Sequence, residues 1–575
     1  MLDLVVRNGF VADGSGARGF RGDLGVRDGR VVAIGRVDER ARSVIEAEGK
    51  VVAPGFVDLH THYDAQLFYD PGLSPSPLHG VTSVVAGNCG LTLAPVAPED
   101  RSFLTRLLAR VESIPVGSVE AGVEFAWRTF GEFLDHVSQR ELAANVGFMV
   151  GHSAVRRAVM GEAASEDGAS PEQLQAMCRL LGDCLASGGM GFSTANVVTQ
   201  VDGDGRPTPP NFASREELVA LAGVCGDHIG TSIEFIPNSF LVGFTDDDVE
   251  LMADMSAAAN RPLNWNTLLV NQSAPELHLR QLRAGEVARR RGGRVVPFFT
   301  PHNLQLQHDF EPGYVFRAIP GWAWLFDLDP DQRLAALADP ARRRELERRA
   351  AEPKTGLAVV VRNWTSYRVN DVGPAEQAAL EGRRVADLAQ EWGLSPFEAM
   401  AEVAVRCRLR VGFVRSQYDP ADAWAWNERL RLLKHPEVVL QASDAGAHLD
   451  MMSGADCPVR CLAELVRERQ AFTVEEMVHE LSDVPARLYG LEGRGRLTEG
   501  AIADVVVFDP ETVGATPLRT VHDLPAGAAR LVTGSTGMER VLVSGREVVH
   551  DGEYTGERPG SALRSGRDTA TVTAR

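Results

Sequence analysis

The sequence predicts an α/β fold: a (β/α)8 barrel of the TIM type, with a small β-sandwich domain built from both ends of the chain. Over residues 54–487, short apolar runs alternate with stretches of helical periodicity, as expected for parallel strands connected by helices. Both ends of the chain read instead as short strands joined by turns. The eight candidate barrel strands are residues 55–59, 82–86, 145–150, 189–193, 231–236, 262–266, 294–299 and 438–442.

The sandwich is expected to comprise residues 1–53 and 488–560. Asn8-Gly9 and Asp28-Gly29 interrupt the first strand-like runs, and both dipeptides favour type I′ hairpin turns because they tolerate positive φ. Near the other end, Ser544-Gly545 separates two further apolar runs. Residues 561–575 are polar, and we expect them to form a disordered tail.

Several helices are predicted by capping boxes, in which a Ser or Thr precedes a Glu or Gln by three residues. These boxes begin at Ser170, Ser214, Ser395 and Thr473. Residues 300–436 are too long for one connection between strands and contain helical patterns of their own, so we expect a large insertion beside the mouth of the site. A second insertion is expected at residues 93–137.

Composition excludes some functions and favours others. The chain has 575 residues, more than one core usually supports, and a formal net charge of −19. This charge argues against nonspecific binding to nucleic acid or to anionic membranes, because both need a basic surface. No apolar run approaches the ~20 residues that span a bilayer, and the seven cysteines are scattered. We expect a cytoplasmic protein that acts on a small molecule; a homo-oligomer remains open.

The predicted first barrel strand ends in His60-Thr61-His62. If strand pairing continues to its tip, the alternation of side chains places both imidazoles on the same side, where they can hold one cation. Such a short pattern also occurs by chance at exposed strand ends. The position favours a metal site, because the carboxyl ends of parallel strands are where α/β folds build their sites.

Residues 53–62, Ala-Pro-Gly-Phe-Val-Asp-Leu-His-Thr-His, resemble the first barrel strand of the amidohydrolase superfamily. Gly87-Asn88-Cys89-Gly90 is similar to the cysteine-bearing second strand of the D-aminoacylase branch, the N-acyl-D-amino-acid deacylases. The likeness extends along nearly the whole chain, including residues 151–153, 191–194, 443–446 and 493–504.

The resemblance assigns roles to two further residues. It implies that Cys89 is a metal ligand, whereas a solitary cysteine is more often a small buried hydrophobe; nucleophilic catalysis by Cys89 is a weaker alternative. It implies that Asp444 contacts the metal and takes the proton of the attacking water. Without the resemblance, Asp444 could equally cap a helix after the last strand.

Four other residues are candidates near the barrel mouth. His152 either polarises the substrate carbonyl or orients the substrate, or is a structural histidine. Arg156 and Arg157 are candidates to receive a substrate carboxylate, although exposed arginines are common. His448, four residues after Asp444, either faces the substrate or covers the rim of the site.

The sequence departs from the deacylase pattern at three strands. The related enzymes supply histidines from the fifth and sixth strands, but here the fifth offers Glu234 and the sixth offers asparagines. The fourth strand ends without the lysine that some amidohydrolases carry. The metal ligands in sight are therefore His60, His62, Cys89 and Asp444, with Glu234 possible as a fifth. This set suits one zinc ion per chain better than two.

The favoured hypothesis is a zinc-dependent hydrolase of a linear amide, most simply an N-acyl-D-amino acid or a peptide-like relative, acting by attack of zinc-bound hydroxide. One alternative is a cyclic amidase that opens a ring on the same scaffold. Another is a metal-poor binding or regulatory protein that has lost catalysis. The fold by itself does not decide among them.

Overall fold

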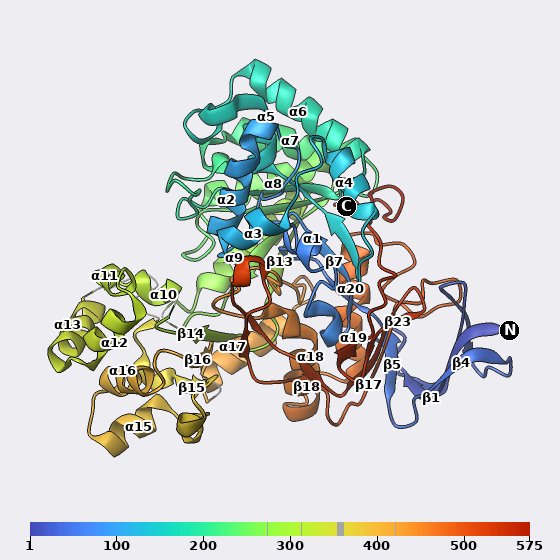
Figure 1. The fold of residues 1–575 in the computed structure, drawn as a ribbon. Helices are drawn as coiled ribbons and strands as arrows, with labels where there is room; N and C mark the ends of the chain where they lie inside the picture. Colours follow the sequence, from blue (N-terminus) through green and yellow to red (C-terminus); the bar gives the residue numbers. More distant parts are fainter. Residues whose placement is uncertain (273, 312, 353–360, 420) are drawn as a thin grey trace.

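The computed structural model describes residues 1–272, 274–311, 313–352, 361–419 and 421–575. It is an α/β protein with mixed sheets (Figure 1). In these ranges, no helix combines the length and the apolarity needed to cross a membrane.

The middle of the chain contains a series of parallel strands at the predicted places. β6 (Phe56–Asp58), β7 (Val81–Ala86) and β8 (Asn145–Phe148) pair in that order. Only Met149 separates β8 from β9, which begins a second parallel series. That series consists of β9 (Val150–Gly151), β10 (Gly191–Ala195), β11 (Ser232–Ile236), β12 (Pro262–Leu268) and β13 (Arg294–Phe299).

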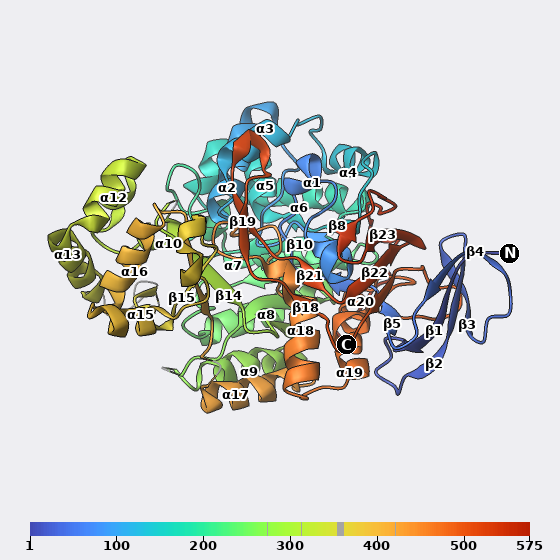
Figure 2. The same cartoon turned by 60° about the horizontal axis from the view of Figure 1, so that its bottom comes forward.

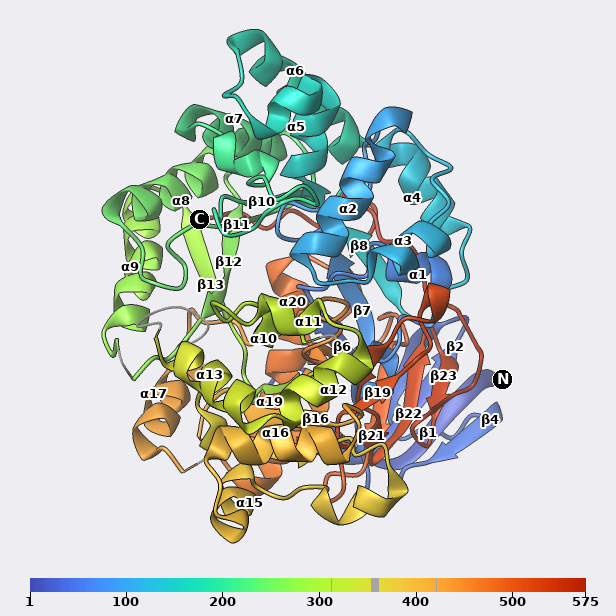
Figure 3. The ribbon, with the colours of Figure 1, turned by 60° about the vertical axis from the view of Figure 1, so that its left-hand side comes forward.

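Helices cover the outer side of the second series (Figure 3). Successive helices contact one another and the strands that they follow or precede. They are α6 (Pro171–Ala186), α7 (Arg215–Gly226), α8 (Asp246–Ala259) and α9 (Leu277–Arg290). The strands are buried throughout β10 and β11, as expected for a sheet covered on both faces.

The eighth predicted strand, residues 438–442, does not form a regular ladder. It makes one parallel bridge from Val439 to Phe298, and a second parallel bridge joins Thr61 to Ala445. Ala442 and Asp444 have φ values of 76° and 57°, so the backbone leaves the extended conformation at this point. The same kink turns the Asp444 segment towards the end of β6.

Strands from both ends of the chain form one nine-stranded sheet (Figure 2). Its order is β24-β23-β22-β17-β5-β1-β2-β3, with β4 on β1. The N-terminal strands are β1 (Leu2–Val11), β2 (Phe20–Arg27), β3 (Arg30–Gly35), β4 (Ala41–Glu46) and β5 (Val51–Pro54). The C-terminal strands are β17 (Val505–Phe508), β22 (Met538–Val543), β23 (Arg546–His550) and β24 (Glu553–Tyr554).

Of the two predicted N-terminal turns, one is confirmed and one is wrong. Asp28 and Gly29 both have positive φ and join β2 to β3. Asn8-Gly9 instead lies within β1, where the register with β2 shifts between Val6 and Gly9. β1 is paired on both edges, so its two ends are held in line and the extra residue is absorbed as a bulge.

Three of the four capping boxes are confirmed, at Ser170 (α6), at Ser395 of α16 (Pro396–Arg406) and at Thr473 of α19 (Val474–Leu481). At the start of α7, Ser214 accepts a hydrogen bond from the Glu217 backbone as predicted. The Glu217 carboxylate, however, binds His152 and Arg156 instead of returning to the cap.

The segment from 300 to 436 has its own apolar core, which includes Trp322, Trp364 and Phe397. Most of it projects from the rest of the protein in Figures 1 and 2, whereas its last helix lies against the main body. A three-stranded antiparallel sheet of β14 (Gln305–His308), β15 (Arg368–Asn370) and β16 (Gly412–Ser416) underlies it. Its helices are α10 (Tyr314–Arg317), α11 (Ala323–Phe326), α12 (Pro330–Ala338), α13 (Pro340–Ala351), α15 (Val385–Trp392), α16 and α17 (Ala423–Leu433).

The predicted second insertion, residues 93–137, contains α2 (Arg101–Val111), α3 (Val116–Gly122) and α4 (Phe130–Ser138). The C-terminal tail differs from the prediction of disorder. Leu563 is fully buried, and its backbone N–H donates to Val146 of β8. Farther along, the Ala570 N–H donates to Gly490. The tail is polar overall, but its buried leucine and its backbone bonds to β8 and Gly490 hold it in place.

Candidate metal centre

The two histidines of the His-x-His motif lie just beyond β6, on a segment fixed from both sides. The Thr61 N–H donates to Val85 of β7, and the His62 N–H donates to Ala445. The Asn88 side chain donates to the backbone oxygens of Leu59, Thr61 and Val85. Strand-like pairing therefore continues past the end of β6, which was the condition for the two imidazoles to share a side.

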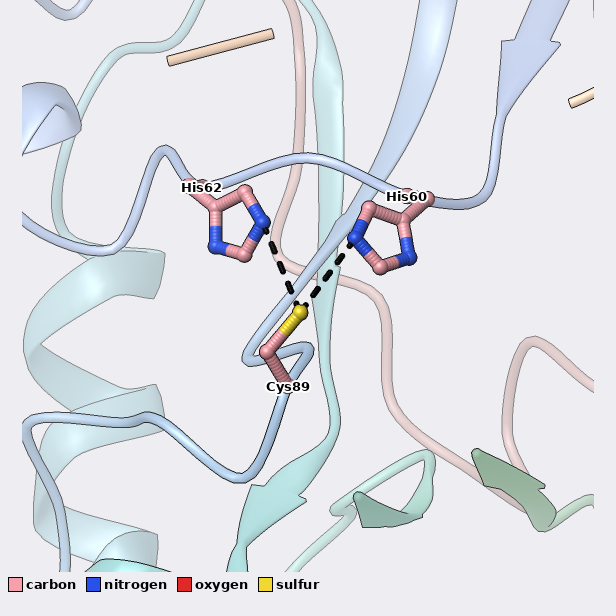
Figure 4. Close-up of side chains that lie close together, drawn as sticks. All are labelled: His60, His62 and Cys89. Carbon is pink, nitrogen blue, oxygen red and sulfur yellow. Dashed lines mark hydrogen bonds between the residues drawn. The ribbon is translucent and has the colours of Figure 1, made fainter. Parts of the chain in front are cut away.

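His60, His62 and Cys89 form the centre of the site (Figure 4). The Cys89 Sγ lies 3.5 Å from His60 Nε2 and 3.9 Å from His62 Nε2. Cys89 has φ of 57° between Gly87 and Gly90, which also have positive φ, so a tight turn after β7 directs its thiol inward. The three side chains are buried, and their nearest ligand atoms lie within 4.8 Å of one another.

Two carboxylates complete the predicted set. Asp444 Oδ1 lies 3.1 Å from His60 Nε2 and 3.4 Å from His62 Nε2. Glu234, on β11, places Oε1 3.9 Å from the Cys89 sulfur and 3.4 Å from His60 Nδ1, while its Oε2 accepts the Cys89 N–H. The side chain of Asp444 is 32% exposed, whereas the other four are almost completely buried. Asp444 is thus the member of the set that is accessible to solvent.

Three acidic residues around this set could not be assigned a role from the sequence. Glu112 is buried at the end of α2, with Oε1 3.6 Å from His62 Nδ1. Asp64 is buried and accepts the Gly87 N–H. Asp58 accepts from the Ser443 hydroxyl and from the His60 N–H. The sequence signal for Asp58 and Asp64 was their closeness to the histidine motif, whereas Glu112 lies in an insertion without any motif.

The electrostatics of the site favour a cation. Burial alone would lower the pKa of His62, but Glu112, Asp444 and Asp64 raise it to about 9. Burial would raise the pKa of Asp444, but its bonds with His60 and His62 hold that pKa well below the ordinary value. Burial, with Glu234 next, raises the pKa of the Cys89 thiol well above its ordinary value. Several carboxylates thus surround His62 and the Cys89 thiol, and their negative charge favours a cation at this position.

The donor set fits zinc. Imidazole nitrogens, a thiolate and carboxylate oxygens are the ligands that zinc takes in proteins. Within the described ranges, His60 Nδ1 and His62 Nδ1 have no hydrogen-bond partner, although each lies near a carboxylate. A ligating histidine typically directs its second nitrogen to such a carboxylate. His60, His62 and Cys89, with Asp444 beside the two imidazoles, are thus the residues that could hold a zinc ion, and Glu234 and Glu112 lie near the second nitrogens of His60 and His62.

The structure places His152 and Arg156 in a different buried group. His152 lies at the start of α5 (His152–Met160); its Nε2 lies 2.8 Å from Glu217 and its Nδ1 2.9 Å from Thr194. Arg156 is fully buried and donates to both oxygens of Glu217. Burial lowers the pKa of His152 despite Glu217. Both imidazole nitrogens and the guanidinium thus have partners other than the metal ligands or a substrate.

The remaining two predicted residues lie nearer the surface. Arg157 donates to Asp100 at 2.6 Å and stacks over Phe103, so its guanidinium already has a carboxylate partner. The backbone N–H of His448 donates to the backbone carbonyl oxygen of Glu112. This bond ties the segment after Asp444 to the residue that contacts His62.

A cavity of about 790 Å³ lies beside this segment. Ser113 and Ile114, directly after Glu112, form part of its wall, as do Leu449 and Asp450, directly after His448. Residues 300–436 supply Gln307, Asp309 and residues 409–412 to its wall. The cavity therefore lies next to the residues that follow Glu112 and His448, and residues between 307 and 412 form part of its wall.

A family model described as Amidohydrolase family matches residues 43–552. An uncharacterized protein of Mycobacterium tuberculosis is 31% identical over 537 residues, which cover 88% of this chain and 84% of that protein. The activity of that protein is not given by its name, but the similarity extends along most of both chains.

Two solved structures are similar over 98% of this chain and all of their own. One is N-acyl-D-glutamate deacylase from Bordetella bronchiseptica, complexed with zinc and a phosphonate inhibitor that mimics the tetrahedral intermediate, at 26% identity and a TM-score of 0.64. The other is D-aminoacylase, whose binuclear metal centre is described as activated by one metal and attenuated by a second, at 25% identity and a TM-score of 0.64. The resemblance noted in the sequence is confirmed.

Proposed function

The chain belongs to the amidohydrolase family, and from this premise we propose that it is a metal-dependent hydrolase that cleaves the linear amide of an N-acyl-D-amino acid or a related N-acyl compound. The observation that carries the proposal is the convergence of His60, His62 and Cys89, with the Asp444 carboxylate 3.1 Å from His60 and 3.4 Å from His62. The zinc of the solved deacylase supports it.

We propose one zinc ion in this site, held by His60, His62, Cys89 and Asp444, with Glu234 close enough to ligate or to orient His60. Bound zinc would acidify a water molecule and polarise the substrate carbonyl. A second ion would need ligands from β11 and β12, where this chain supplies Glu234, Asn264 and Asn266 rather than histidines.

Asp444 moves the protons. An aspartate is ordinarily ionised at neutral pH, and Asp444 is the partly exposed member of the set. It can accept the proton of the attacking water and deliver it to the nitrogen of the departing amine. Breaking the C–N bond then releases a carboxylic acid and an amine. His152 we assign to structure, because its two nitrogens are bonded to Thr194 and Glu217.

The substrate carboxylate needs a cation other than Arg156 and Arg157, which already pair with Glu217 and Asp100. Arg110 and Arg410 line the cavity, from α2 and from the insertion respectively. We propose that one of them receives the carboxylate, because a guanidinium binds a carboxylate through two parallel hydrogen bonds.

We further propose that the two parallel series, joined through β8 and β9 and linked by the Phe298–Val439 and Thr61–Ala445 bridges, form a (β/α)8 barrel over residues 54–487. Residues 300–436 are its insertion. Residues 1–53 and 488–560 form the second domain, whose core is the nine-stranded sheet. A cytoplasmic enzyme acting on a small molecule is consistent with this organisation.

The test is an assay of N-acetyl-D-glutamate and other N-acetyl-D-amino acids with zinc-loaded protein, with the L isomers as controls. Release of free amino acid, lost on chelation and restored by zinc, supports the proposal. The same assay with a substrate lacking the carboxylate tests the role of the cavity arginines. Opening of a cyclic amide without cleavage of any linear one would favour the cyclic amidase instead.

A further inference from the structure

A second buried group of metal-binding side chains lies apart from the first. His302 follows β13, and Cys457 and Cys461 begin and end α18 (Cys457–Cys461). All three are buried, and their ligand atoms lie within 4.8 Å of one another. The two cysteines are four residues apart on a helix, which places their thiols on the same face.

The group contains polar atoms that no other described residue satisfies. Neither ring nitrogen of His302 has a hydrogen-bond partner among the described residues, although the side chain is completely buried. The same is true of Asp456 Oδ1, which lies 3.8 Å from His302 Nε2. Leaving a buried polar group unpaired costs about 1–3 kcal/mol. A cation between His302 and Asp456 would bind one ring nitrogen of His302 and the Oδ1 atom of Asp456.

We propose that His302, Cys457, Cys461 and Asp456 form a second zinc site, with a structural role. One imidazole, two thiolates and one carboxylate make a four-ligand set of the type that closed, tetrahedral zinc sites use. The two thiolates favour a soft or borderline metal such as zinc over magnesium or calcium. This inference does not depend on the activity proposed above.

The charges balance when zinc binds. The two thiols lose their protons, so the ligands carry three negative charges in total. The zinc ion contributes two positive charges, and Arg460, which donates to Asp456 Oδ2 at 2.6 Å, contributes the third. Asp456 can therefore present Oδ1 to the metal while Oδ2 remains bound to Arg460. This neutral arrangement suits a fully buried position.

The second zinc site would connect two segments near the first metal centre: the one that follows β13 and the one that follows Asp444. His302 lies on the segment after β13, where Pro301 accepts from Arg429. Cys457 lies on the segment that continues from Asp444 and His448. A zinc ion held by both segments would fasten the Asp444 loop to the end of β13. Four protein ligands would leave no open position on the zinc ion, so we assign the site to structure and not to catalysis.

Cobalt in place of zinc tests the second site separately, because thiolate ligands give cobalt a charge-transfer absorption. In a Cys89→Ala variant the first site has no thiolate, so any such absorption reports the second site. We expect it to be retained at one cobalt per chain in Cys89→Ala, and to disappear in Cys89→Ala/Cys457→Ala/Cys461→Ala, which removes both thiolates of the second site. A matched control is Cys89→Ala/Cys184→Ala, which removes another buried cysteine and should keep the absorption.

A second readout uses the unaltered chain and avoids variants that fail to fold. Elemental mass spectrometry of zinc-loaded protein should find two zinc ions per chain, and thiol titration after unfolding without reductant should find all seven cysteines free. Absence of a thiolate absorption in Cys89→Ala, with one zinc in the unaltered chain, would overturn the proposal. So would two missing thiols, because they would indicate that Cys457 and Cys461 form a disulfide.

Discussion

Two buried groups near the same strand ends combine histidine with carboxylate, but they differ in their charge balance. In the first, His60 and His62 face Asp444, Glu234 and Glu112. In the second, His152 faces Glu217, which also binds Arg156. The second group carries its own cation, so its carboxylate is neutralised and its imidazole can remain uncharged.

This contrast separates the metal centre that we propose from the histidine that we assign to structure. Both groups combine buried imidazole with carboxylate, so residue types alone do not separate them. The difference is the charge balance: Arg156 completes the second group, whereas the first gathers several carboxylates around two histidines and a thiol. Predictions that alter these charges test the comparison.

Replacing Asp444 should have the largest effect. In Asp444→Asn the proton acceptor is lost, so we expect the rate of amide hydrolysis to fall by about 10²–10⁴-fold. His60, His62 and Cys89 remain, so metal should still bind. The measurement is kcat for the best N-acyl substrate alongside metal content, with the exposed Asp38→Asn as control. Nearly full activity in Asp444→Asn would remove Asp444 from the mechanism.

Replacing Glu217 should harm stability rather than metal binding. Glu217→Ala leaves Arg156 buried without its carboxylate, and we expect a loss of about 3–5 kcal/mol in the free energy of unfolding. Glu166→Ala breaks the exposed pair with Arg206 and should cost at most ~1 kcal/mol. Denaturant unfolding of both variants measures the difference. Equal losses would mean that the buried group contributes no special stability.

Replacing Glu112 should weaken metal binding without removing a metal ligand. Glu112→Gln removes the charge next to His62 Nδ1, and we expect metal affinity to fall by about 10–100-fold. Competition with a chelating dye measures the affinity, and Glu124→Gln, an exposed change in the same insertion, is the control. Unchanged affinity would show that Glu112 does not orient His62.

The smallest effect concerns acid stability. Burial would raise the pKa of Glu217, but His152 and Arg156 hold it below its ordinary value of 4.5. A carboxyl with a lowered folded-state pKa stabilises the protein above its unfolded pKa, and this contribution is lost as the pH falls through the folded value. As the pH is lowered below about 4.5, the denaturant midpoint of unfolding should therefore fall less steeply in Glu217→Gln than in the unaltered chain. Parallel slopes would contradict the assignment.

Local patterns in the sequence were enough to place several parts of the site. The apolar run before His60 predicted β6, and the alternation of side chains predicted that both histidines would share a side. Cys89 and Asp444 follow equally clear apolar runs. These residues come together because parallel strands meet at their carboxyl ends.

Other features depend on contacts between distant segments and could not be predicted locally. Glu217 looks like a capping residue, and only the approach of α5 to α7 shows that it binds Arg156 instead. Glu112 lies in an insertion without a motif. Asn8-Gly9 has the composition of a turn, but pairing on both edges of β1 makes it a bulge.

The most direct test of the account compares the metal content of His60→Ala and His152→Ala with that of the unaltered chain, by elemental mass spectrometry after identical zinc loading. We predict that His60→Ala loses one zinc per chain together with amide hydrolysis, while folded His152→Ala keeps its full zinc content. Full zinc content in His60→Ala, or the same loss in folded His152→Ala, would contradict the assignment of the metal to the first group.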